Sequence, residues 1–262
     1  MGFAFQERYQ AGDSPLHLLD ARVKVVATLL LILGIVLTPQ FAWPAYPLIW
    51  ALLAGLSIIG GIGIGRLART ATLALPFTLA AITLLFTTPG SPLVQVLGLT
   101  ITDAGLGRFL AIVLKSWLAV QAALLLAMTT HFTDLLWALN SLRLPATLIA
   151  IISFMYRYLF TLREETERLL RARASRMAAS PTGRAGGSLA WRARVAGGMV
   201  GNLFLRSYER SERVYAAMLA RGYKGQLRTL NAPPLSRRAV LLGAVPVAIL
   251  LLIELVALIW WR

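Results

Sequence analysis

The sequence predicts an all-α, polytopic membrane protein with about five transmembrane helices. Of its 262 residues, 58% are hydrophobic and 14% are charged, whereas a soluble domain carries about 25% charged residues. The mean hydropathy is +0.70, and several apolar runs approach the roughly 20 residues that a spanning helix needs. A third observation is the uneven distribution of charge, because most of the basic excess falls in one region between apolar runs.

Five apolar segments are expected to span the membrane. They cover about residues 25–37, 47–64, 70–87, 104–128 and 239–261. The third contains Pro76, which a membrane helix tolerates and which can kink it. The first segment is short, but it extends back if Lys24, which precedes it, snorkels towards the interface. Lys115 lies deeper in the fourth segment, where it needs a partner, the headgroup region or a protein-lined cavity.

The basic region at 132–238 decides the expected topology. It holds 18 Lys/Arg against six Asp/Glu, so +12 of the net charge of +15 lies there. The positive-inside rule assigns such a region to the cytoplasm, together with the N-terminus. We therefore expect an N-terminal membrane domain of four spans (1–130), a cytoplasmic domain (131–238) and a C-terminal transmembrane helix (239–262). No motif that reads nucleic acid occurs, so anionic lipid or an acidic protein is the expected contact.

Within this basic region the sequence predicts two long helices. Pro145 suits the first turn of a helix, and no Pro or Gly follows before Met177, which allows a helix of about 33 residues. A break rich in Ser, Pro and Gly at 180–187 separates this helix from a second one at 188–221. Gly222 then fits the left-handed position that ends a helix.

Each long helix ends in an arginine with small neighbours. The two elements are Ala174-Ser175-Arg176 and Ala220-Arg221-Gly222. Small neighbours let the planar guanidinium project into a groove of a partner and meet a carboxylate there. The alternative is that the helix dipole alone favours arginine at a C-terminus.

Metal binding and catalysis find little support in the sequence. The chain has no cysteine and only two histidines, His17 and His131, neither of them in an HxH or HxxxH pattern. No GxSxG, HExxH or GxxxxGK[ST] motif occurs. We therefore expect no catalytic residues, no metal site and no cofactor. The alternative is a membrane-embedded, lipid-modifying enzyme that uses Lys115, Glu254 and the basic region.

The acidic residues of the long helices are expected to form ion pairs on a solvated face. Glutamate and arginine four positions apart stabilise a helix without any catalytic role. The expected pairs are Glu164–Arg168, Glu167–Arg171 and Glu209–Arg213.

Six segments, spread in order over about 210 residues, carry a resemblance to a known family. They read SPLHLLDARVK (14–24), LFTTPGSPL (85–93), TTHFTDLL (129–136), YRYLF (156–160), ERLLRARASR (167–176) and ERVYAAMLARGYKG (212–225). Together they resemble the transmembrane T component of energy-coupling-factor transporters, most closely the cobalt/nickel-type branch. The last segment is the most specific of the six.

The resemblance implies that residues 131–238 form a coupling domain. In the family, two long coupling helices cross on the cytoplasmic side, and each ends in an X-Arg-X signature. Carried over, Ser175-Arg176-Met177 and Ala220-Arg221-Gly222 would dock in grooves on two ABC-type ATPase subunits. The family commonly has glycine where this chain has Met177, which leaves Ala172-Arg173-Ala174 as an alternative register.

The resemblance also implies a function. The chain would be a non-catalytic coupling subunit of an ATP-driven cobalt importer in the cell's inner membrane, with the ATPase activity on other chains. A separate, multi-span S component would bind the metal. Nickel or a vitamin is the alternative substrate, because selectivity would lie in the S component.

Overall fold

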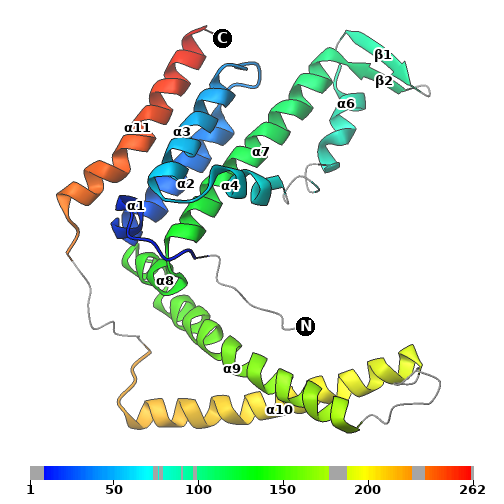
Figure 1. Ribbon diagram of the computed structural model, residues 1–262, viewed down its shortest axis with the longest axis vertical. Helices are drawn as coiled ribbons and strands as arrows, with labels where there is room; N and C mark the ends of the chain where they lie inside the picture. Colours follow the sequence, from blue (N-terminus) through cyan, green and yellow to red (C-terminus); the bar gives the residue numbers. More distant parts are fainter. Residues whose placement is uncertain are drawn as a thin grey trace. The chain divides into compact units, whose positions relative to one another are not determined.

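The computed structural model describes residues 9–72, 76, 79–89, 91–96, 99–176, 188–225 and 234–260. The chain forms two compact units, which we name by content. The membrane unit comprises 1–142 and 231–262, and the helix-pair unit comprises 143–230. The predicted all-α class is confirmed, with one small β-hairpin added in the membrane unit (Figure 1).

The membrane unit is a bundle in which α2 and α7 lie at the centre (Figure 1). Its helices, in chain order, are α1 (Pro15–Leu18), α2 (Ala21–Leu37), α3 (Ala45–Ile59), α4 (Ile64–Ala71), α6 (Leu84–Thr87), α7 (Asp103–Thr129), α8 (Phe132–Ser141) and α11 (Arg237–Trp260). Helix α2 contacts α7, α8 and α11, and α3 contacts α7 and α11. The C-terminal helix is therefore packed against the N-terminal part of the chain.

Side chains that cap the helices explain where two of the central helices begin. The Asp20 carboxylate accepts a hydrogen bond from the backbone N–H of Arg22 at the start of α2. The Thr102 hydroxyl accepts one from the backbone N–H of Gly105 at the start of α7. Such caps satisfy N–H groups that have no partner within the helix.

The core of the membrane unit consists of aliphatic side chains that face neighbouring helices. Ile35 of α2 and Leu53 of α3 are 0% exposed, and Leu250 of α11 is 1% exposed. Other apolar side chains of these helices, such as Leu33, are exposed on the outside of the bundle. A bundle with an apolar exterior is what a bilayer requires, because lipid tails are as apolar as leucine.

The predicted span at 70–87, which Pro76 can kink, is helical in the part that the structure describes, but it is not one α-helix there. Helix α4 ends at Ala71, and a 3-10 helix, η2 (Leu79–Thr83), precedes the short α6. Pro76 lies between them, and proline removes a helical hydrogen bond and clashes with the preceding turn. Residues 73–75 and 77–78 of this segment lie outside the described residues.

The uncharged segment after α6 forms two antiparallel strands, β1 (Pro92–Val96) and β2 (Leu99–Thr102). The sequence analysis did not predict them. The letters PLVQV and LTIT are rich in β-branched residues, which favour strands. A helix over this segment would be too short to span a membrane. Its length therefore does not argue against a hairpin.

Three described helices, α7, α9 (Ala146–Arg176) and α11, are long and apolar enough to cross a membrane, and α3 is a shorter apolar helix. Helix α2 has 17 residues, slightly fewer than the roughly 20 of a typical span. The class of α-helical, polytopic membrane protein is thereby confirmed. The number of five spans stays a prediction.

The helix-pair unit consists of α9 and α10 (Leu189–Ala220), with 31 and 32 residues. These bounds confirm the two long helices predicted from the sequence. The Ser188 hydroxyl accepts a hydrogen bond from the Trp191 N–H and begins α10. The helices contact each other and cross (Figure 1). The predicted break at 180–187 lies outside the described residues.

Candidate functional site

The C-terminal end of α10 presents Arg221 through a well-defined helix stop. Gly222 has a φ of +81°, and its N–H donates to the Leu219 carbonyl, while the Tyr223 N–H donates to the Met218 carbonyl. This pair of bonds is the Schellman motif. The predicted role of Gly222 in ending the helix is thus confirmed.

Arg221 therefore follows the last helical residue and lies in the turn that ends the helix. Ala220, Arg221 and Gly222 are all exposed. No heavy atom of the described residues lies within 4 Å of where a Gly222 side chain would stand. The exposed position of Arg221 is what docking into a partner groove would require.

The C-terminal end of α9 carries the first candidate signature. Arg176 is the last residue of the helix and is exposed, as is Ser175, whose hydroxyl donates to the Ala172 carbonyl. Arg173, in the alternative register, is half-buried. Met177, the third residue of the predicted signature, lies outside the described residues.

Ion pairs along α9 differ in part from those predicted. Glu167 pairs with Arg171 at 3.7 Å, as expected, and also with Arg163 at 3.0 Å. Among the described residues, Glu164 and Arg168 form no ion pair within 4 Å, and neither do Glu209 and Arg213. Among the described residues, α9 thus has two ion pairs at a spacing of four, of which one was predicted.

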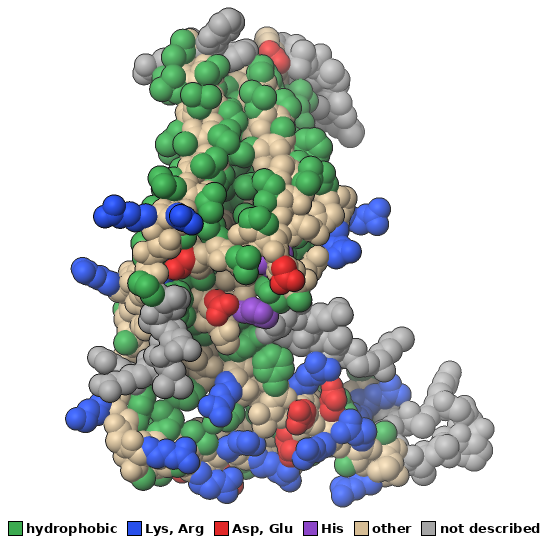
Figure 2. Space-filling model, turned by 60° about the vertical axis from the view of Figure 1, so that its left-hand side comes forward, with side chains coloured by type: hydrophobic (Ala, Val, Ile, Leu, Met, Phe, Trp, Pro, Cys, Tyr) green, Lys and Arg blue, Asp and Glu red, His purple; other side chains and the backbone are tan. Residues whose placement is uncertain are grey.

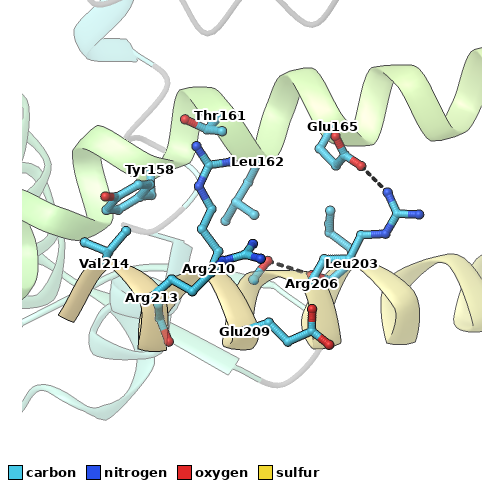
Figure 3. A pocket seen from close by; sticks show the side chains of 12 residues that line it. Tyr158, Thr161, Leu162, Glu165, Leu203, Arg206, Glu209, Arg210, Arg213 and Val214 are labelled. Carbon is cyan, nitrogen blue, oxygen red and sulfur yellow. Dashed lines mark hydrogen bonds and ion pairs between the residues drawn. The ribbon is translucent and has the colours of Figure 1, made fainter. Parts of the chain in front are cut away.

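The sequence analysis missed the strongest polar contact between α9 and α10. An Arg206 guanidinium nitrogen lies 2.6 Å from a Glu165 carboxylate oxygen. The guanidinium carbon of Arg210 lies 5.8 Å from the centre of the Tyr158 ring, close enough for a cation–π interaction. Both contacts border a cavity of about 260 Å³ between the helices (Figure 3).

The surface of the helix-pair unit is both basic and apolar. Lys and Arg side chains gather over α9 and α10 (Figure 2). Phe204 of α10 is 67% exposed, and Tyr208 and Leu205 are also exposed. Exposed aromatic and aliphatic side chains of this size mark a surface that contacts protein or lipid.

The two histidines serve the folding of the N-terminal segment. His17 hydrogen-bonds the Ser14 hydroxyl at 2.7 Å and the Gln10 carbonyl at 2.8 Å, which uses both ring nitrogens. The ring of His131 stacks on Tyr9 at 3.5 Å. Among the described residues, no group of three His, Cys, Asp or Glu side chains could hold a metal ion.

Two charged residues of the membrane unit, Lys115 and Glu254, form hydrogen bonds to groups of the same unit. Lys115 donates to the Val36 carbonyl at 3.0 Å, so the predicted partner is a main-chain group. Glu254 of α11 accepts a 2.7 Å hydrogen bond from the Thr38 hydroxyl at the end of α2. Carboxylate and ammonium thus stabilise helix contacts here.

Lys24 lies within α2, which begins at Ala21, ahead of the predicted apolar run. Its side chain is buried, and the ammonium donates to the main-chain carbonyls of His17 and Thr129. A buried ammonium needs such acceptors in place of water. Lys24 therefore holds the start of α2 against the end of α7.

Comparison with known proteins identifies the family. The family CbiQ, described as "Cobalt transport protein", matches residues 12–231. The energy-coupling factor transporter transmembrane protein EcfT of Heliobacterium modesticaldum is 31% identical over 83% of this chain and 83% of its own length. EcfT of Thermanaerovibrio acidaminovorans is 30% identical over 87% of this chain and 86% of its length.

A third relative carries the name of the family itself. The cobalt transport protein CbiQ of Rhodobacter capsulatus is 28% identical over 55% of this chain and 56% of its own length. The family match covers most of the membrane unit and all of the helix-pair unit. The chain belongs to the CbiQ family of cobalt transport proteins, a membrane transport component related to the transmembrane subunits of energy-coupling factor transporters.

Proposed function

We propose that this chain is the non-catalytic coupling subunit of an ATP-driven cobalt importer. In this proposal α9 and α10 are coupling helices on the cytoplasmic side of the inner membrane. Two ABC-type ATPase subunits bind their ends, and a multi-span S component binds the metal. ATP-driven closure of the ATPase pair moves the helices, and the helices shift the S component.

The observation that carries the proposal is the pair of exposed arginines at the ends of α9 and α10. Arg176 ends one helix and Arg221 follows the end of the other, and both side chains are accessible. A rigid helix transmits displacement of its end, and a guanidinium can grip a carboxylate in a groove bidentately. Ser175, Ala220 and Gly222 would supply the small surroundings, with Met177 as the third residue of the first signature.

The charge of the chain supports the proposed orientation. The region 131–238 is the strongly basic part, so we place it with the N-terminus in the cytoplasm. The ATPase subunits would meet it there. The exposed Phe204 and Tyr208 of α10 suit contact with the S component and membrane lipid.

Cobalt is the proposed substrate because the matching family is described as a cobalt transport protein and one relative bears that name. Several relatives are named for the transporter class without a metal. Selection of the metal would lie in the S component, which agrees with the structural roles of His17 and His131 here. Metal analysis of the reconstituted importer distinguishes cobalt from nickel.

The experiment is a double substitution, Arg176→Ala with Arg221→Ala, in the complex expressed with its ATPase and S subunits. We expect the ATPase subunits to be lost from the purified complex and uptake of radioactive cobalt to fall at least about tenfold, since each charge-assisted contact is worth more than 1 kcal/mol. The control is Arg194→Ala on an exposed part of α10. Wild-type assembly and uptake in the double variant would refute the docking role.

A further inference from the structure

The cavity between α9 and α10 has the chemistry of a site for a phosphate group. It is lined from α10 by Arg206, Arg210 and Arg213, which lie on one helix face at spacings of four and three. Two glutamates, Glu165 and Glu209, also line it, so cations outnumber anions. Arginine side chains from α10 extend towards α9 across this space (Figure 3).

The three arginines are not equally available. Arg206 is engaged by Glu165 at 2.6 Å. Arg210 lies against the ring of Tyr158. Among the described residues, neither Arg210 nor Arg213 forms an ion pair within 4 Å. A stacked guanidinium keeps its N–H donors free for an anion. Hydroxyl groups of Thr161 and Ser211 also line the cavity.

The position of the cavity along α9 indicates where the anion comes from. The first half of α9, from Ala146 to Phe160, has Arg157 as its one charged residue, whereas charges are frequent from Arg163 onward. The cavity begins at Tyr158, at this change of character. In a membrane protein such a boundary, with an aromatic residue beside it, lies at the level of the lipid headgroups.

The neighbouring surface suits the rest of a lipid molecule. Phe204 and Leu205 of α10 follow directly after the lining residue Leu203, and both are exposed. Apolar side chains next to arginines match the acyl chains and phosphate of a lipid. From these observations we propose that the cavity binds the phosphate group of an anionic phospholipid, with Arg210 and Arg213 as its main ligands.

This site would give the helix pair a fixed depth at the membrane surface. The phosphate would add to the contacts Glu165–Arg206 and Tyr158–Arg210 between the two helices. The role is separate from docking of the ATPases, because it uses the crossing of the helices and not their ends.

The test counts bound lipid on the purified full chain by native mass spectrometry. The chain is exchanged into micelles with dioleoyl phosphatidylglycerol or, as the neutral counterpart, dioleoyl phosphatidylcholine. We expect preferential retention of phosphatidylglycerol and about fivefold weaker retention in Arg210→Gln, the effect of one basic side chain near an anionic headgroup. Arg210→Lys should restore most of it, because it keeps the charge.

The matched control is Arg194→Gln, which removes one exposed arginine of α10 outside the cavity. Equal retention of phosphatidylglycerol by Arg210→Gln, Arg194→Gln and the unaltered chain would overturn the proposal. Displacement of the lipid by millimolar inorganic phosphate would assign the site to a free anion and also overturn it. If Arg210→Gln lost the S component from the complex but kept its lipid, the cavity would be a protein interface instead.

Discussion

The membrane unit and the helix-pair unit are both helical, but they bury their side chains very differently. Leu53 in the membrane unit is 0% exposed, whereas Leu205 on α10 is 60% exposed. Helix α10 has no buried residue among those described, and α9 buries only Ile149 and Ala150. The membrane unit buries a core of its own, while the helix pair leaves its apolar and basic surface exposed.

The two units also differ in whether their charged side chains are bonded within the unit or exposed. In the membrane unit, Lys24, Lys115 and Glu254 are each bonded to a group of the same unit. In the helix-pair unit, Arg176 and Arg221 stand exposed at helix ends. A charged side chain that is bonded within its own unit stabilises that unit, whereas an exposed charged side chain is available to bind another molecule.

The largest expected effect is on stability, and it is measured by truncating one leucine to alanine in each unit. Leu53→Ala should lower the free energy of unfolding by about 3 kcal/mol, because it leaves a cavity in a packed core. Leu205→Ala should change it by no more than about 0.5 kcal/mol. Unfolding in detergent, followed by tryptophan fluorescence, measures both. Similar losses of stability in the two variants would remove the distinction between the units.

A smaller effect concerns the turn that presents Arg221. Gly222→Ala meets no neighbouring atom but forces alanine into a positive φ, which costs about 1 kcal/mol. We expect ATPase capture by the purified chain to weaken about fivefold, as that cost implies.

Gly201→Ala is the matched control for that turn. Gly201 lies inside α10, also with open space around it, and alanine there should stabilise the helix by about 1 kcal/mol. Its capture of ATPase should equal that of the unaltered chain. A larger loss in Gly201→Ala than in Gly222→Ala would show that the turn does not matter for docking.

The smallest effect is expected at the contact between the long helices. The Arg206 and Glu165 side chains are 62% and 29% exposed, and exposed ion pairs contribute about 0–1 kcal/mol. A double-mutant cycle with Glu165→Gln and Arg206→Gln measures their coupling. We expect less than about 1 kcal/mol, decreasing with salt. A coupling of several kcal/mol would mean that the pair is a buried structural element and that the helices are locked together.

The two long helices could be predicted closely because their signals are local. Pro145, the absence of breakers after it and Gly222 fixed bounds that the structure confirms within a residue or two. The helix ends at Arg176 and Arg221 were predicted from these same local signals. The exposed state of these arginines agrees with the docking hypothesis, which stays a prediction.

The errors arose where partners are distant in the sequence or where a pattern is ambiguous. Lys24 bonds a carbonyl 105 residues away, and Glu165 bonds Arg206 41 residues away. Neither contact has a local signal. The segment 70–87 was apolar enough for one helix, but its described part includes a 3-10 helix, η2, between α4 and α6. Apolar runs around a proline do not by themselves separate a kinked helix from a broken one.

The most direct test of the account locates the ATPase beside Arg221. Because the chain has no cysteine, Ala220→Cys creates a single attachment point for a benzophenone cross-linker, and Gln40→Cys, exposed in the turn after α2, provides the control. In the assembled complex, light should link the ATPase subunit to position 220 and not to position 40. Equal cross-linking from both positions, or none from position 220 in an intact complex, would contradict the account.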